Sequence, residues 1–286
     1  MDGMDRLDGV INFLDYLMVD NLEEGVYDPG IFKAIFLAGG PGSGKSFIVD
    51  RVGTPLVHGM RIVNSDDTFE HLLKKNKISM NLLNLQKNDP VDYERAMVLR
   101  KKSKEITARK KATMINGRLG MVIDGTGHEY TKLSKQAEEL EQLGYDTYMI
   151  FVHTSLDVAL ERNERRQRKV QKDVAIKSWN DVQQNKDRFA TYFGANYSLV
   201  DNSTPQHFTP AKETGEEKSR GFSLKGDYVE WPHPTVLRQI YDKVRTFVKK
   251  PIQSQKAKRW IAWEMGKKKS TAVWARIQKQ ARARRG

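Results

Sequence analysis

The clearest sign of chemistry in this sequence is a set of glycines at fixed spacing before a lysine and a serine. Residues 39–46 match the G-x-x-x-x-G-K-[ST] pattern of phosphate-binding loops. Glycines let backbone N–H groups converge on phosphate oxygens, and a following helix adds its positive end. Lys45 would reach the β- and γ-phosphates of ATP, and the Ser46 hydroxyl would ligate Mg²⁺. The pattern predicts a nucleotide site formed by Gly39, Gly40, Pro41, Gly42, Ser43, Gly44, Lys45 and Ser46.

Two acids, Asp66 and Asp67, follow a second apolar segment at residues 60–64. A carboxylate at the carboxyl end of a parallel strand faces the ligand crevice. There it can accept a proton from a hydroxyl that attacks a phosphate. We therefore expect Asp66 to be a general base and Asp67 to face the acceptor. The alternative is that one of the pair caps a helix starting near Thr68.

A third apolar run, residues 119–123, ends in Asp124-Gly125-Thr126. An apolar run ending in aspartate resembles a Walker B element, whose carboxylate holds the metal directly or through water. Asp124 is therefore a candidate Mg²⁺ ligand. Alternatively, Asp124 and Thr126 line the acceptor pocket, or the segment is only a turn after a strand.

Basic residues in the segment 160–169 recur at intervals of three and four. They are Arg162, Arg165, Arg166 and Lys169. On a helix this spacing gives one basic face, which suits a lid that closes on a triphosphate and neutralises charge during phosphoryl transfer. Because Glu161 and Glu164 lie in the same segment, an exposed helix with internal salt bridges is the alternative.

Apolar runs that alternate with helical patterns must position these residues. We expect strands at residues 31–38, 60–64, 119–123, 147–152 and 197–200, and helices at 5–20, 91–116, 131–143, 176–192 and 235–249. Gly144 and Ser155 suit helix ends. The alternation predicts an α/β fold with a parallel sheet of about five strands and helices on both faces.

The charge is concentrated at one end of the chain. The net charge is +13, but residues 249–286 hold 13 basic residues and one acid, Glu264, which leaves +1 for residues 1–248. Trp260, Trp263 and Trp274 are interleaved with these basic residues. Such a composition favours binding to nucleic acid or another polyanion through the extension, with tryptophans stacking on bases. Alternatively the tryptophans dock the extension onto the body, since Trp260 and Trp263 are three residues apart.

Composition excludes several classes of protein. There are no cysteines, so disulfides, iron–sulfur clusters and cysteine-based zinc sites are excluded. The sequence has no long apolar span and no signal-peptide pattern, and we expect a cytoplasmic protein with no membrane partner. We divide the chain into an acidic helical segment (1–30), a nucleotide-binding domain (31–204), a linker or flap (205–234) and a basic helical extension (235–286).

The order of these motifs resembles the zeta-toxin and polynucleotide-kinase branch of P-loop kinases over about residues 33–203. The segments 37–46 and 122–127 are similar to zeta toxins, and the segments 64–67 and 162–166 to bacteriophage 5′-hydroxyl polynucleotide kinase. The general style resembles kinases encoded by phages, which implies the host cytoplasm as the location.

The resemblance implies roles for individual residues. Asp66 would be the general base, Arg166 the lid arginine on the donor phosphates with Arg162 supporting it, and Asn202 would lie near the adenine. Phe69 stands where polynucleotide kinases of this branch often carry an arginine, which weakens the transfer of their acceptor site. No D-x-D-x-T phosphatase motif is present.

We therefore expect a kinase that moves the γ-phosphate of ATP to a hydroxyl, with Mg²⁺ as cofactor. The first hypothesis for the acceptor is nucleic acid, at a 5′-hydroxyl end or a hydroxylated base. The alternative is a small molecule: a UDP-amino-sugar, nucleoside or nucleotide. A third hypothesis is an ATP-binding protein associated with nucleic acid that has no kinase turnover.

Overall fold

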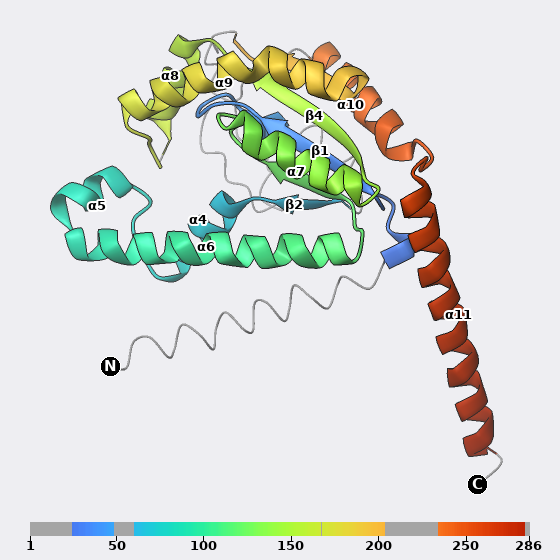
Figure 1. Ribbon diagram of the computed structural model, residues 1–286. Helices are drawn as coiled ribbons and strands as arrows, with labels where there is room; N and C mark the ends of the chain where they lie inside the picture. The colour runs from blue at the N-terminus through green and yellow to red at the C-terminus, as the bar shows by residue number, and fades with distance from the viewer. Residues whose placement is uncertain (1–24, 49–59, 167, 204–233, 284–286) are drawn as a thin grey trace, which may run out of the picture.

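The computed structural model (Figure 1) describes residues 25–48, 60–166, 168–203 and 234–283, with side chains over residues 236–272 of the C-terminal part. Its centre is a five-stranded parallel sheet in the order β2-β3-β1-β4-β5. The strands are β1 (Lys33–Ala38), β2 (Arg61–Val63), β3 (Met121–Asp124), β4 (Asp146–His153) and β5 (Tyr197–Asp201). This confirms the predicted fold class. The expected helix at 5–20 lies outside the described residues, and so does the expected linker at 205–234 except for its last residue, Pro234, which begins a helix.

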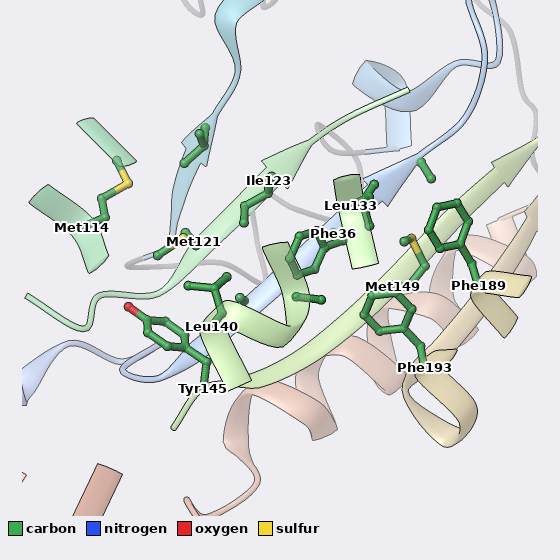
Figure 2. Packing of buried hydrophobic residues seen from close by; sticks show 14 of the residues in the cluster. Phe36, Met114, Met121, Ile123, Leu133, Leu140, Tyr145, Met149, Phe189 and Phe193 are labelled. Atoms are coloured by element: carbon green, nitrogen blue, oxygen red, sulfur yellow. The ribbon is translucent and has the colours of Figure 1, made fainter. Parts of the chain in front are cut away.

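Both faces of the sheet are covered, which explains the unbroken apolar runs in its central strands. All six residues of β1 are buried. On one face, α7 (Tyr130–Gln142) and α9 (Lys172–Phe193) pack against alternate strand residues such as Phe36 and Met149 (Figure 2). On the other face, α10 (Pro234–Lys249) packs through Ile240, Val244 and Phe247. Helix α10 therefore contributes to the same core as the strands.

A second, smaller apolar cluster joins three helices that follow β2. They are α4 (Ser65–Lys75), α5 (Leu82–Asn88) and α6 (Pro90–Asn116), and their core includes Phe69, Leu73, Leu85 and Leu99. Helix α4 begins at Ser65, three residues before the expected position. Asn64 is its N-cap and accepts a hydrogen bond from the Asp66 backbone N–H. Neither Asp66 nor Asp67 is therefore needed as a cap.

The expected continuous helix through the basic segment 160–169 is wrong. Helix α8 (Leu156–Arg165) ends before Arg166, whose backbone is extended. The Asn163 side chain donates to the Val170 carbonyl at 2.7 Å and accepts from the Val170 N–H at 3.0 Å. Asn163 is buried, so these bonds turn the chain back on itself. Arg166 and Lys169 consequently leave the helical face that Arg162 and Arg165 occupy.

The C-terminal helix α11 (Gln255–Ala283) is anchored at its start and then runs away from the sheet (Figure 1). Ala257 is fully buried, and the Trp260 ring packs edge-on against Phe32 with centroids 5.5 Å apart. Trp263 is 57% exposed, with the Lys267 ammonium over its ring. Trp260 therefore docks the helix onto the body, as one of the two alternatives predicted, and Trp263 does not. The Trp274 side chain lies outside the described part. Among the helices of the described ranges, none has both the length and the hydropathy of a membrane span.

Trp260→Ala is expected to lower the free energy of unfolding by about 3 kcal/mol, because it removes a large ring that packs against the main core. Trp263→Ala is expected to change it by less than about 0.5 kcal/mol, since that ring is mostly in water. Urea denaturation of the two variants measures both values. Equal effects would contradict the docking of α11 through Trp260.

Candidate active site

The carboxyl ends of the parallel strands bring the expected site residues to one edge of the sheet. Residues 39–46 follow β1, residues 64–67 follow β2, and Asn202 follows β5. Asp124 is the last residue of β3, the strand beside β1. Because β1 lies between β3 and β4, the phosphate loop emerges at the middle of this edge.

In the loop at residues 39–46, the lysine side chain binds the backbone of the loop itself. The Lys45 ammonium donates to the carbonyls of Gly39 and Gly40. Burial lowers the pKa of Lys45, and the nearby charge of Arg166 lowers it further, while Asp124 and Asp66 act in the opposite direction. The three charged groups that act on the ammonium are all groups that the sequence singled out.

Gly42 can only be glycine in this loop. Its φ is +76°, and a Cβ there would lie 2.3 Å from the Ala159 carbonyl oxygen in α8. Ala159 presents backbone atoms, which cannot rotate away as a side chain would. The close approach brings α8 directly against the phosphate loop.

Gly42→Ala is expected to lower the free energy of unfolding by about 2 kcal/mol, because alanine is strained at positive φ and the loop must also move away from α8. ATP affinity should fall with it. Gly266→Ala is a matched control, since no atom of another described segment lies within 4 Å of its added Cβ and alanine favours a helix. Thermal denaturation and ATP titration measure both; equal behaviour of the two variants would contradict the assigned loop geometry.

Asn202 and Arg162 bind backbone carbonyls of the phosphate loop. The Asn202 side chain is buried, donates to the Ser43 carbonyl at 2.7 Å and accepts from the Arg162 guanidinium at 3.3 Å. Arg162 also donates to the Gly42 carbonyl at 3.4 Å. Burial lowers the pKa of Arg162. Both residues thus hold the backbone of the loop, whereas the sequence placed Asn202 near the adenine and Arg162 beside the lid arginine.

Asn64 links the two acidic strand ends, a role that the sequence did not predict. Its amide donates to Asp124 Oδ2 at 3.0 Å and to Asp67 Oδ1 at 3.1 Å. Burial raises the pKa of Asp124 and the charge of Asp66 adds to this, while Lys45 and Arg166 oppose it. The other Asp124 oxygen, Oδ1, is buried and has no hydrogen-bond partner among the described residues.

Asp66 lies between two arginines that the sequence did not single out. Arg100, on α6, donates to its Oδ1 at 2.5 Å, and Arg168, after α8, donates to its Oδ2 at 2.9 Å. Burial alone would raise the pKa of Asp66, but the charges and hydrogen bonds of Arg168 and Arg100 bring it below its ordinary value. Asp66 is therefore an ionised carboxylate at neutral pH.

The remaining predicted residues lie around this centre. Ser46 is exposed at the start of α2 (Lys45–Ile48). The Thr126 carbonyl accepts from the Gly39 N–H at 2.9 Å, and its hydroxyl contacts the His128 ring. Asp67 is exposed, and so is Arg166, whose charge acts on both Lys45 and Asp124. In the described part of the chain, no cluster of three or more histidine or acidic side chains forms a metal cage.

A phosphate loop at the carboxyl edge of a parallel sheet, with a carboxylate and arginines facing it, defines the class of P-loop nucleotide-binding enzymes. Within that class, the chain belongs to the AAA domain family AAA_33, which matches residues 35–189, just over half of its length. The protein is an ATP-dependent kinase that transfers phosphate to an alcohol group. No curated protein is significantly similar to it in sequence.

Solved structures are similar to the chain at low sequence identity. The AvrRxo1-ORF1:ORF2 complex with ATP is 13% identical, with a TM-score of 0.48 and coverage of 85% of this chain and 74% of that one. The PezAT toxin–antitoxin system of Streptococcus pneumoniae is 14% identical, with a TM-score of 0.40 and coverage of 76% and 86%. A gluconokinase from Sinorhizobium meliloti 1021 is 15% identical, with a TM-score of 0.37 and coverage of 61% and 85%.

Proposed function

We propose that the protein phosphorylates a hydroxyl of a small molecule, with Asp66 as the general base. The observation that carries this proposal is that the phosphate loop, Asp66 and Asp124 all lie at the carboxyl ends of parallel strands, where the Asn64 side chain binds both Asp124 and the Asp66 backbone N–H. The resemblance of residues 37–46 and 122–127 to zeta toxins supports the same class of acceptor.

The residues suit transfer of a phosphoryl group between two oxygens. The acceptor oxygen attacks the γ-phosphorus, the bond from that phosphorus to the β–γ bridging oxygen breaks, and the hydroxyl proton passes to Asp66. Lys45 and Arg166 stabilise the negative charge on the phosphoryl oxygens. Arg162 and Asn202 keep the loop in the shape that receives the phosphates.

The site also suits Mg²⁺, which would offset the negative charge of the phosphates. Asp124 Oδ1, which has no partner among the described residues, and the exposed Ser46 hydroxyl are the oxygen ligands that fit it. One or two protein oxygens are enough, because Mg²⁺ in nucleotide sites takes its other ligands from phosphates and water. Burial raises the pKa of Asp124, and a nearby divalent cation would favour its ionised form.

Nucleic acid is the less well supported acceptor, because α11 is anchored where the strands begin, and the site lies where the strands end. Trp260 packs on Phe32, which precedes β1, and Lys256 donates to the Gln142 carbonyl, which precedes β4. The site lies at the opposite ends of those strands. Six residues of β1 at about 3.3 Å each separate the two edges by about 20 Å. Basic residues of α11 therefore start far from the phosphate loop.

The proposal is tested by incubating the protein with γ-labelled ATP and Mg²⁺ against UDP-amino-sugars, nucleosides, nucleotides, and 5′-hydroxyl or hydroxymethylated polynucleotides. Label in a small molecule is the expected result. Combined replacement of Lys267, Lys268 and Lys269 by Gln should leave kcat and KM within about twofold, since about 20 Å exceeds the screening length in physiological salt. Label only in a polymer, lost in the triple variant, would restore the nucleic-acid hypothesis.

A further inference from the structure

Two arginines from different parts of the chain meet on the acceptor side of Asp66, and the transfer step described above uses neither. Arg100 comes from the middle of α6, and Arg168 from the segment that Asn163 turns back after α8. Each holds a different oxygen of the same carboxylate. Two guanidinium groups therefore meet at the Asp66 carboxylate, and one of them, Arg168, also pairs with Glu70.

The two guanidinium groups rest on a rigid support. The Phe69 ring is fully buried in the cluster of α4, α5 and α6. Arg100 lies 5.0 Å and Arg168 6.0 Å from its centroid, and Arg168 also contacts Glu70 at 3.3 Å. Both side chains keep contact with solvent, at 30% exposure for Arg100 and 19% for Arg168. The pair is thus both fixed in place and accessible to a ligand.

This arrangement is poorly suited to Asp66 acting alone as a base. Two guanidinium partners hold its pKa below the ordinary value, which weakens its ability to take a proton. A second anion that shares the arginines would reduce their hold on Asp66 and make it more basic. Each guanidinium has five N–H donors, and its planar fork matches the oxygens of a phosphate or carboxylate.

We propose that Arg100 and Arg168 bind an oxyanion, a phosphate or carboxylate group, that the acceptor alcohol carries near its reactive hydroxyl. This inference rests on the proposed function and narrows its substrate class to anionic alcohols. Among the acceptors suggested by sequence, nucleotides and UDP-amino-sugars fit it and uncharged nucleosides do not. Phe69 stands where polynucleotide kinases of this branch often carry an arginine. In this chain Arg100 and Arg168 lie beside the Phe69 ring and provide positive charge at that place.

Matched acceptors that differ only in the anionic group test the proposal: a nucleoside and its 5′-monophosphate, an N-acetylated amino sugar and its 1-phosphate, and a hexose and its uronic acid. The wild-type protein should favour the anionic member of at least one pair by about tenfold or more in kcat/KM. Arg100→Gln and Arg168→Gln should each reduce that preference by roughly 10- to 100-fold, mainly through KM. The phosphate and carboxylate pairs separate the two sources of the oxyanion.

Arg95→Gln is the matched control, because Arg95 lies on the same helix and pairs with Asp92 on the surface. It should keep the wild-type preference. Equal loss of kcat on charged and neutral acceptors in Arg100→Gln would overturn the proposal and leave the arginines as supports for Asp66. Equal use of both members of every pair by the wild type would also overturn it, although the kinase function would stand.

A binding experiment keeps the inference separate from the kinase assay. With the phosphate loop saturated by ADP, calorimetric titration of inorganic phosphate or acetate into the full-length protein should reveal one further anion site. Arg100→Gln should lose that site, and Arg95→Gln should keep it. Absence of the site in the wild type, with no preference for anionic acceptors, would overturn the inference, whereas a second anion site without any phosphotransfer would leave it standing and count against the proposed function.

Discussion

Asp66→Asn is expected to lower kcat for phosphate transfer by about 10²- to 10⁴-fold, the range that a well-placed general base supplies. The amide keeps the size of the side chain but cannot take a proton from the acceptor hydroxyl. ATP affinity should change little, because the Asp66 side chain pairs with Arg100 and Arg168 on the acceptor side. Steady-state transfer from labelled ATP and calorimetric titration of ATP measure the two quantities.

The pH dependence gives an independent check on Asp66. Its pKa lies below the ordinary value, so the carboxylate is fully ionised well above that value. Its ion pairs therefore contribute stability that is fully present above the unfolded-state pKa and is lost only as pH falls through the lower folded-state pKa. We expect no loss of kcat/KM from Asp66 between about pH 9 and pH 5. The control for Asp66→Asn is Asp92→Asn, on the surface of α6, which should retain wild-type turnover.

Lys45→Ala is expected to reduce kcat by about 10²- to 10³-fold and to weaken ATP binding. The Lys45 ammonium donates to the Gly39 and Gly40 carbonyls, and it is the cation that the loop itself brings to the phosphates. Lys45→Arg should not rescue turnover, because a planar guanidinium does not replace a compact charge in this space. Calorimetric titration of ATP and transfer assays measure both effects.

The control for Lys45 is Lys74→Ala, an exposed lysine in the last turn of α4. It should leave ATP affinity and turnover near their wild-type values. Wild-type affinity and rate in Lys45→Ala would contradict the assignment of residues 39–46 as the nucleotide site.

Sequence patterns predicted the parts of the site that depend on strand ends. Buried strands are continuous apolar runs, and parallel strands place their carboxyl ends together, so residues 39–46, Asp66 and Asp124 could be assigned to one edge. The order of strands followed from no local pattern, but it was not needed to bring these residues together.

Contacts between distant segments could not be predicted in the same way. Arg100 stands 34 positions from Asp66, and Arg168 stands 98 positions from Glu70. Nothing in the spacing of Arg100 distinguishes it from the other basic residues of α6. Arg168 reaches Asp66 because the Asn163 side chain ends α8 early, and a helical pattern cannot reveal such a tertiary bond. An origin in a phage stays a prediction, and so do the boundaries of the four segments.

The charge of the C-terminal part was a weaker guide to function than its packing. A count of charges treats residues 249–286 as one basic tail. The fold divides it, because Ala257 belongs to the main core and Trp260 packs against that core, whereas Trp263 faces solvent. Lysines of α11 are exposed because the helix runs along the outside of the molecule. Their exposure is therefore explained without a polyanion partner.

The most direct test of the phosphate loop and Asp66 as one reaction centre is a crystal structure with ADP, Mg²⁺ and a planar aluminium fluoride in place of the transferred phosphoryl group. We predict the phosphates of ADP within residues 39–46, with the Lys45 ammonium moved from the Gly39 carbonyl onto the planar group. Asp66 should face that group from the side opposite ADP, with room for an acceptor oxygen between them. A nucleotide bound elsewhere, or a planar group out of line with Asp66, would contradict the account.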